Sequence, residues 1–240
     1  ESFVFNAGDA QATAAAFEGA AHVVKNRFEI TRLTTNAMEP RAALGHWDAG
    51  EERYTFYAGA QRPYAWRATL AKNVFHVSEH QIRIVTGDVG GSFGLKGSIH
   101  PEVPLVAWAS KRLGRPVKWT CDRSEGFIAD DHARDMVSDV EMALDDQGRI
   151  LGMRAKTNAN LGAYVAFMGG APPTGNVGTM AGTYRTPAMH VQVTGVFTNT
   201  NPLSPYRGAG RPESAYMIER MVALAARQLG IDEVELRRRN

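Results

Sequence analysis

The chain has 240 residues, of which 44% are hydrophobic and 22% are charged, so it can form a folded core and is not a disordered segment. Its 27 Lys and Arg against 25 Asp and Glu exclude a general nucleic-acid binder, because the charge is nearly balanced. Cys121 is the one cysteine, which excludes a disulfide framework, a cysteine-based zinc site and a cysteine-ligated iron–sulfur cluster. We therefore expect a protein of the reducing cytoplasm.

The first half of the chain alternates strands and helices. Residues 9–20 are rich in alanine and predict a short helix, and the alternating side chains of residues 22–31 predict a half-buried strand. Pro63 begins a helix whose apolar residues recur at helical spacing. The other predicted elements of this half are strands at 53–61, 81–85 and 117–121 and a helix at 101–113. This order is typical of a two-layer α+β unit.

The second half has a similar style. Strands at 139–143 and 150–157 flank Asp145-Asp146-Gln147-Gly148, whose turn residues predict a hairpin. A glycine-rich stretch at 162–182 follows, then a strand at 190–198. The clearest helix of the chain is 212–229, which Gly230 ends.

We therefore predict an α+β fold of two-layer mixed sheets with helices, arranged as two similar lobes, residues 1–122 and 123–240, with a weak boundary at 122–139. No apolar run approaches the roughly 18 residues that a membrane span requires. The chain lacks an initiator Met and stops directly after a helix, which indicates a piece of a longer polypeptide.

A glycine cluster at 87–94 follows the strand 81–85, so its backbone amides can approach a ligand closely. The phosphate-loop motif is absent because Lys96 is followed by Gly97, and the dinucleotide motif is absent because Val89 replaces its first glycine. A cofactor-binding loop is the favoured interpretation, and a plain structural turn is an alternative.

A second alternative is a serine hydrolase, since Gly90-Gly91-Ser92-Phe93-Gly94 satisfies G-x-S-x-G with Ser92 as nucleophile. That motif requires a helix immediately after the serine, whereas the next strong helix begins near Pro101. A non-catalytic binding or assembly domain is a third possibility.

A loop with two arginines, residues 204–213, precedes the last long helix. Free amides at the start of that helix, with Arg207 and Arg211, form a place for an anion or an electron-rich oxygen. The alternative is that either arginine is paired with a carboxylate such as Glu213 and serves folding alone.

Three further features admit simple structural explanations. Gln61, which closes a strand, either caps the following helix or faces the glycine cluster. Asp130-Asp131-His132 with Asp135 could bind a hard metal, but a charged loop is favoured because no calcium-binding pattern surrounds it. Cys121, in a predicted strand, is interpreted as an inert core thiol.

Four motifs occur together in a familiar order: Met38-Glu39-Pro40-Arg41, Gln61, the segment 89–94 and the segment 206–211. Over essentially its whole length the chain resembles the molybdopterin-binding large subunit of the xanthine dehydrogenase, aldehyde oxidase and carbon monoxide dehydrogenase family. It is most similar to the form II relatives that are labelled carbon monoxide dehydrogenase large chain. The combination is more specific than any single motif.

The resemblance implies roles for particular residues. Gln61 would hydrogen-bond an oxo ligand of molybdenum, the Phe93 backbone amide would approach the same ligands, and Arg207 would be the catalytic residue beside metal and substrate. The implied cofactor-binding set is Gln61, Gly90, Gly91, Ser92, Phe93, Gly94, Arg207 and Gly208. The cofactor's dithiolene sulfurs would hold the metal, so no protein ligand to it is expected.

Some positions depart from the family pattern. The copper–molybdenum carbon monoxide dehydrogenases have a cysteine where this chain has Gly208, and xanthine oxidases have a substrate-binding glutamate where it has Gly97. Ser92 replaces the commoner third glycine. The catalytic glutamate near the family's C-terminus has no counterpart here, so the isolated fragment is expected to be inactive.

The resemblance thus implies a molybdenum-dependent oxidoreductase that hydroxylates a small aldehyde, heteroaromatic or other electrophilic carbon with oxygen from water. The cofactor would be molybdenum–molybdopterin, expected in its cytosine dinucleotide form. Electrons would leave through [2Fe-2S] clusters on a small subunit and FAD on a medium subunit, with a dimer of heterotrimers as the intact assembly.

Overall fold

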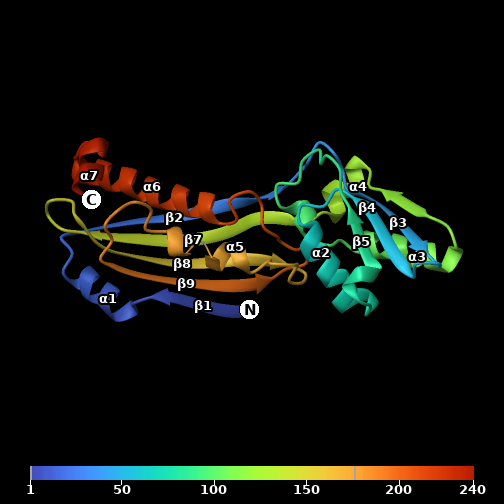
Figure 1. The fold of residues 1–240 in the computed structure, drawn as a ribbon. Coiled ribbons are helices and arrows are strands. Elements are labelled where there is room, and N and C mark those ends of the chain that lie inside the picture. The colour runs from blue at the N-terminus through green and yellow to red at the C-terminus, as the bar shows by residue number, and fades with distance from the viewer. Residues whose placement is uncertain (1, 176) are drawn as a thin grey trace. The chain divides into compact units, whose positions relative to one another are not determined.

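The computed structural model describes residues 2–175 and 177–240 and divides the chain into two compact units (Figure 1). The five-stranded unit comprises the residues up to Leu33 together with His132–Asn240, and the four-stranded unit comprises Thr34–Asp131. Both units combine helices with a mixed sheet, so the α+β prediction is confirmed.

The sheet of the five-stranded unit has the strand order β1-β9-β8-β7-β2. The strands are β1 (Phe3–Gly8), β2 (His22–Thr34), β7 (His132–Leu144), β8 (Ile150–Gly162) and β9 (Ala188–Phe197). The predicted hairpin is β7 and β8, which pair antiparallel, whereas β8 and β9 pair parallel. The short helix α5 (Ala171–Gly175) and a 3₁₀ turn (Val177–Thr179) lie in the connection between β8 and β9.

The two faces of this sheet carry different helices (Figure 1). Alternate strand residues such as Met142 and Met153 join the core with Ile218 and Met221 of α6 (Arg211–Leu229). The intervening residues face the other way, where α1 (Ala10–Glu18) packs on β8 and β9. The half-polar, half-apolar alternation of the sequence therefore sorts side chains between a buried and an open face.

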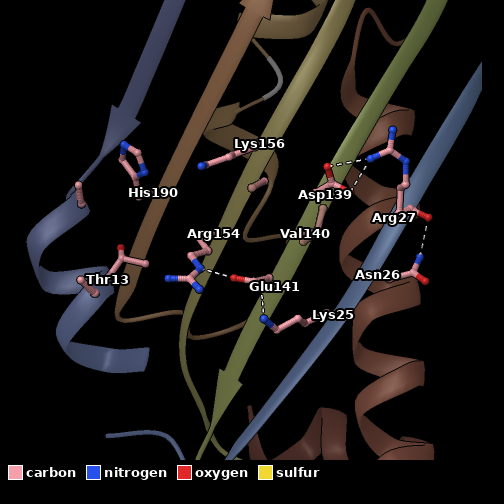
Figure 2. A pocket seen from close by; sticks show the side chains of 13 residues that line it. Thr13, Lys25, Asn26, Arg27, Asp139, Val140, Glu141, Arg154, Lys156 and His190 are labelled. Atoms are coloured by element: carbon pink, nitrogen blue, oxygen red, sulfur yellow. Dashed lines mark hydrogen bonds and ion pairs between the residues drawn. The ribbon is translucent and has the colours of Figure 1, made fainter. Parts of the chain in front are cut away.

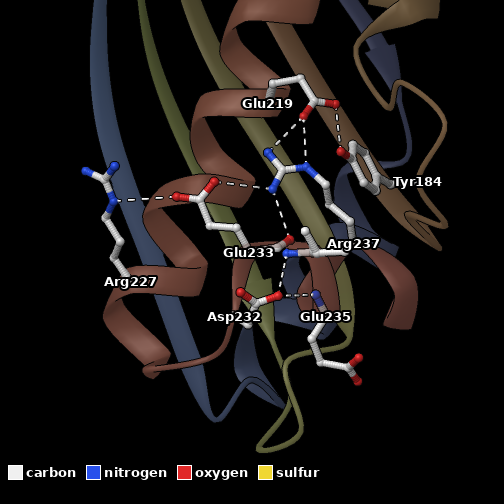
Figure 3. A network of polar contacts seen from close by, with 8 residues as sticks. Tyr184, Glu219, Arg227, Asp232, Glu233, Glu235 and Arg237 are labelled. Atoms are coloured by element: carbon white, nitrogen blue, oxygen red, sulfur yellow. Dashed lines mark hydrogen bonds and ion pairs between the residues drawn. The ribbon is translucent and has the colours of Figure 1, made fainter.

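The C-terminal helix α7 (Glu233–Arg239) is tied to α6 by charged groups (Figure 3). Arg237 binds Glu219 of α6 through two nitrogens, at 3.1 and 3.2 Å, and Tyr184 donates a hydrogen bond of 2.6 Å to the same carboxylate. Burial, and then the bond to Glu219, raise the pKa of Tyr184. This network secures the last turn of the chain against the five-stranded unit.

The four-stranded unit has the strand order β5-β4-β3-β6, with β4 and β5 parallel and the other pairs antiparallel. Its strands are β3 (Ala42–Asp48), β4 (Arg53–Ala58), β5 (Ile82–Val85) and β6 (Val117–Thr120). Its helices are α2 (Pro63–Thr69), which a π-helix (Leu70–Phe75) continues, α3 (Glu102–Leu113), α4 (Arg123–Ala129) and 3₁₀ turns at Glu79–Gln81 and Leu95–Gly97. An aromatic and aliphatic core around Phe56 and Trp66 lies between sheet and helices.

The prediction missed β3, and the reason is Gly45 in its middle, which weakens a strand pattern. A Cβ at Gly45 would lie 2.4 Å from the backbone nitrogen of Ala107 in α3. The glycine is therefore required for the close approach of helix to sheet. The short elements β1, α4 and α7 were also missed.

The predicted lobes 1–122 and 123–240 differ from the compact units of the structure. The first 33 residues belong with the C-terminal part, because β1 and β2 form the two edges of the sheet built by β7, β8 and β9. The four-stranded unit is thus an insertion between β2 and β7, and its end at Asp131 lies later than residue 122. Strand pairing across a long sequence separation leaves no local pattern, which explains the correction.

Candidate functional site

The glycine loop, residues 87–94, is held from the side by Gln61. The Oε1 atom of Gln61 accepts hydrogen bonds from the Ser92 hydroxyl at 2.5 Å and the Gly94 backbone N–H at 3.0 Å. Two donors on one oxygen determine which end of the amide faces the loop. The Nε2 amino group therefore faces away from these donors, and within the described chain it has no partner. The interpretation of Gln61 as a helix cap is wrong, because Arg62 is the N-cap of α2 and lacks a side-chain cap bond.

The backbone of the glycine loop has an unusual conformation. Gly91, Phe93 and Gly94 have φ of +100°, +51° and +120°, the left-handed region that favours glycine. Within the described residues the N–H groups of Gly91, Ser92 and Phe93 donate to no protein acceptor. Successive free amides in such a turn form a concave set of donors suited to an anion or an oxo group.

An ion pair between a buried lysine and a half-exposed glutamate supports this loop. Lys96, whose side chain is 3% exposed, binds Glu39 at 2.5 Å. The same carboxylate oxygen accepts the Gly90 N–H at 2.9 Å, and the backbone N–H of Glu39 donates to the Gly90 carbonyl at 2.9 Å. The hydrogen bond from Lys96, followed by that from Gly90, keeps the pKa of Glu39 below its usual value. Sequence reasoning assigned no role to Glu39 or Lys96, although Glu39 lies in the Met38-Glu39-Pro40-Arg41 motif.

Arg41 of that motif is a structural residue. It is 6% exposed and binds Asp130 at 2.6 Å and Glu102 at 2.7 Å. Burial opposes its charge, but the hydrogen bonds to Glu102 and Asp130 raise the pKa of Arg41. Burial, and then the Arg41 charge, lower the pKa of His100, whose Nε2–H donates to the Leu95 carbonyl at 3.1 Å. The motif therefore anchors the segment that follows the glycine loop.

The Arg207 loop, residues 204–212, belongs to the five-stranded unit, whereas the glycine loop belongs to the four-stranded unit. Its turn has positive φ at Gly208, Ala209 and Gly210 in succession. Arg211 donates to the Gly208 carbonyl at 3.2 Å, so this arginine serves the loop itself. The guanidinium of Arg207, by contrast, is exposed and has no partner in the described part of the protein.

Glu213 is paired with neither Arg207 nor Arg211. This carboxylate, 2% exposed, forms its ion pair with Arg134 of β7. The alternative that Arg207 is paired with Glu213 for folding alone therefore does not apply. Arg211 does have a structural partner, but it is a backbone carbonyl rather than a carboxylate.

The other candidate residues have structural partners. Asp130 binds Arg41, and Asp135 accepts hydrogen bonds from Arg32 and Asn160 at 2.9 Å. Within residues 2–175 and 177–240, His, Cys, Asp and Glu form no group suited to a metal ion. Cys121 is buried, as predicted for a core thiol, and this burial raises the pKa of the thiol to about 11.

Ser92 lacks the surroundings of a hydrolase nucleophile. Its hydroxyl donates to Gln61, which cannot act as a base, and accepts the Lys96 N–H at 3.1 Å. No histidine is among its partners in the described chain, and a 3₁₀ turn, Leu95–Gly97, rather than an α-helix follows it. A base and a helix after the serine are both required for that chemistry.

A hollow of about 850 Å³ lies on the open face of the five-stranded sheet, away from α6 (Figure 2). Glu141 pairs there with Lys25 at 2.6 Å and with Arg154, and Asp139 pairs with Arg27 at 3.1 Å. Its carboxylates are thus neutralised by neighbouring cations, and none of the predicted site residues lines it. We assign the cofactor no place in this hollow.

The residues of the glycine loop fit a molybdopterin group. Such a group presents oxo and phosphate oxygens, which need hydrogen-bond donors and no protein metal ligand. The free amides of Gly91, Ser92 and Phe93 and the free Nε2 of Gln61 are donors of that kind. A Cβ at Gly90 would lie 2.6 Å from the Cβ of Glu39, so a side chain there would push the loop away from its support.

Comparison with known proteins shows which family the chain resembles. The family model of the molybdopterin cofactor-binding domain matches residues 1–240. The chain is 39% identical over 227 residues to the 6-hydroxypseudooxynicotine dehydrogenase complex subunit gamma of Paenarthrobacter nicotinovorans, covering 94% of this chain and 28% of that protein. It is 36% identical over 241 residues to the carbon monoxide dehydrogenase large chain of Hydrogenophaga pseudoflava, covering 99% and 30%.

Solved structures have the same fold. The crystal structure of quinoline 2-oxidoreductase from Pseudomonas putida 86 superposes with a TM-score of 0.90 at 31% identity, covering 99% of this chain and 30% of that chain. Carbon monoxide dehydrogenase from Oligotropha carboxidovorans superposes with a TM-score of 0.92 at 30% identity and the same coverage. The chain thus spans less than a third of the length of these relatives.

No helix among the described residues is both long and apolar enough to cross a membrane. The model of the molybdopterin cofactor-binding domain matches residues 1–240. The chain belongs to the molybdopterin cofactor-binding domain family of molybdenum hydroxylases.

Proposed function

We propose that this domain holds the molybdenum end of the cofactor with Gln61, the glycine loop and Arg207, within a larger molybdenum-dependent hydroxylase. One observation carries the proposal. Ser92 and Gly94 fix the oxygen of the Gln61 amide, which leaves its amino group free, and the backbone amides of residues 91–93 also have no protein acceptor in the described chain. Donors arranged before the ligand arrives require little reorganisation during the reaction.

The cofactor supplies the redox chemistry when it is bound, and water supplies the oxygen. The chain's own residues bind and orient. Gln61 Nε2 and the Phe93 N–H donate to the oxygens of the cofactor, and Gly90, Gly91 and Gly94 allow the backbone to approach. Arg207 supplies an unpaired positive charge toward cofactor and substrate oxygens, while Gly208 and its neighbours shape the turn that presents it.

Electrophilic carbons of small heteroaromatic rings are the substrates that the observations favour. The related proteins include quinoline 2-oxidoreductase and nicotine 6-hydroxylase large subunit. A cysteine at position 208, the feature expected of a copper–molybdenum site, does not fit here. Gly208 has φ of +93°, and a Cβ would lie 2.5 Å from Cγ and Cδ of Pro212.

The rest of the machinery would lie outside this chain. We propose a cytosine dinucleotide form of the cofactor, FAD on a medium subunit and [2Fe-2S] clusters on a small subunit, assembled as a cytoplasmic dimer of heterotrimers. The names of the related gamma subunit and large chain support an assembly of several subunits. The catalytic glutamate would also lie outside the 240 residues, so the isolated domain would have no turnover.

The test is Gln61→Glu in the whole protein purified with its partner subunits. A carboxylate keeps the two accepted hydrogen bonds from Ser92 and Gly94 but lacks the free amino donor. Loss of one preorganised donor lowers kcat by about 10²-fold or more. Molybdenum and pterin content, measured after denaturation, separates lost binding from lost turnover.

Gln147→Glu, an amide changed in a turn of the other unit, is the matched control and should leave kcat unchanged. If Gln61→Glu retains both the kcat and the cofactor content of the unaltered protein, the proposal is wrong.

A further inference from the structure

Strand β7 begins with an irregular turn at Arg134 and Asp135, whose charged side chains contact different partners. Arg134 and Asp135 both have positive φ, +66° and +56°, although neither is glycine. The regular ladder between β7 and β8 begins only at Met136, opposite Ala159. Such consecutive left-handed residues are costly and persist only where surrounding contacts hold them.

Asp135 anchors the inner side of this turn. Its Oδ2 accepts hydrogen bonds from Arg32 Nε of β2 and from Asn160 Nδ2 of β8, both at 2.9 Å. Arg32 also donates to the Thr200 hydroxyl at 2.6 Å. The turn is thus tied to two neighbouring strands and to the segment that leads into the Arg207 loop.

Arg134 contacts the Arg207 loop at two points and the first turn of α6 at a third. Its Nη2 donates to the carbonyl oxygen of Arg207 at 3.3 Å, and its guanidinium lies 5.1 Å from the ring centre of Tyr206. It also forms the ion pair with Glu213, in the first turn of α6. Because Arg134 is 13% exposed and Glu213 2% exposed, water screens this pair little.

The Arg207 loop has few bonds of its own. Within residues 206–211 the backbone contacts are Ala209 N to Tyr206 O at 2.6 Å and Arg211 N to Gly208 O at 3.1 Å. Neither involves the N–H or carbonyl of Arg207, whose carbonyl is held from outside by Arg134. Three successive residues with positive φ make this turn strained, so it would relax if the contact with Arg134 were lost.

We propose that Arg134 is the positioning residue of this site: through Tyr206, the Arg207 carbonyl and Glu213 it fixes the direction in which the Arg207 guanidinium is presented. The effect on turnover rests on the proposed function of Arg207, whereas the effect on loop order does not. A lysine would keep the charge of Arg134, but its single ammonium group lacks the planar fork that reaches three partners at once.

The experiment compares Arg134→Met and Arg134→Lys in the whole protein with its partner subunits. Hydrogen exchange of amides 206–211 should accelerate about 10-fold or more in Arg134→Met and less in Arg134→Lys, with amides 220–226 of α6 unchanged. A displaced guanidinium lowers kcat by about 10²-fold in Arg134→Met. The lysine variant should recover part of both losses.

Arg27→Met, which removes an exposed arginine of the same unit, is the matched control and should change neither readout. Should Arg134→Met prove insoluble, Glu213→Gln weakens the ion pair that positions Arg134 while changing less of the structure. It should accelerate exchange in the same amides. Unchanged exchange of residues 206–211 in a folded Arg134→Met or Glu213→Gln protein overturns the inference. Faster exchange with unchanged kcat would leave Arg134 as the anchor of the loop but refute the proposed function of Arg207.

Discussion

The two loops proposed to bind the cofactor present their donors in opposite ways. The glycine loop offers backbone N–H groups, and its shape is imposed by Gln61 and Glu39, which are distant in sequence, together with the neighbouring Lys96. The Arg207 loop offers one side chain, and its shape comes from a tight turn held by Arg134.

Because one loop offers backbone donors and the other a side-chain donor, the two loops should tolerate different substitutions. A backbone donor survives any side-chain change that leaves the chain path intact, so the sensitive residues of the glycine loop are its supports. A side-chain donor is lost with its own residue, but its direction depends on the local turn. The following predictions test this contrast, beginning with the largest expected effect.

Removing the support of the glycine loop should have the largest consequence. Glu39→Ala leaves the buried ammonium group of Lys96 without its carboxylate; because the Glu39 side chain is 43% exposed and partly screened by water, we expect a cost of about 3 kcal/mol, the low end for a buried pair. The measurement is the free energy of unfolding of the four-stranded unit, from hydrogen exchange of the β4 amides. Glu79→Ala, which breaks an exposed pair with Arg67 in the same unit, should cost less than about 1 kcal/mol. Equal losses of unfolding free energy in the two variants would show that burial of the lysine does not determine how much its ion pair contributes to stability.

Gly208→Ala tests the turn of the other loop. Left-handed strain and overlap with Pro212 together should cost about 3 kcal/mol, so we expect the Arg207 loop to rearrange and kcat to fall. Gly178→Ala is the control, since a Cβ there meets nothing within 4 Å. Thermal denaturation of the whole protein, together with exchange of amides 206–211, measures both effects. A variant with the exchange pattern of the unaltered protein would contradict the assigned strain.

Two glycines of the same loop should differ. Gly90→Ala would place its Cβ 2.6 Å from that of Glu39 and should cost about 1–3 kcal/mol, whereas Gly87→Ala has open space and should change stability by less than about 0.5 kcal/mol. Cofactor content should fall in Gly90→Ala alone. Similar losses at both positions would mean that loop flexibility, rather than contact with Glu39, governs binding.

The smallest effect is a dependence on pH. Because the pKa of Glu39 is lower in the folded protein than its usual 4.5, the carboxylate stabilises the glycine loop fully above about pH 4.5. This stabilisation is lost as pH falls through the folded pKa. Exchange of amides 90–97, corrected for its intrinsic pH dependence, should therefore show an acid-induced step that Glu39→Gln lacks. A step of the same size in that variant would assign the titration to another group.

Several elements were predictable because their patterns are local. The period of two predicted β2 and β9, the helical period predicted α6, and the stop at Gly114 helped to predict α3, all close to the observed bounds. The turn residues Asp145 to Gly148 predicted the hairpin, but its strands are longer than expected: β7 begins at His132 rather than 139, and β8 ends at Gly162 rather than 157. Strand β3 was missed because Gly45 weakens its pattern, and that glycine is required by the close packing of helix α3, which begins 57 residues later. The lobe boundary was misplaced because edge strands pair with the far end of the chain.

The sequence by itself indicated the family, the two loops and the candidate residues Gln61, Phe93 and Arg207, because the order and spacing of four short motifs resemble that family. Only the tertiary structure decided how the candidates are held: which end of the Gln61 amide is free, that Glu39 and Lys96 support the glycine loop, and that Glu213 pairs with Arg134 rather than with its neighbours. The physical reason is that hydrogen bonds and ion pairs join residues by proximity in space, and the spacing of residues along a chain does not encode that proximity.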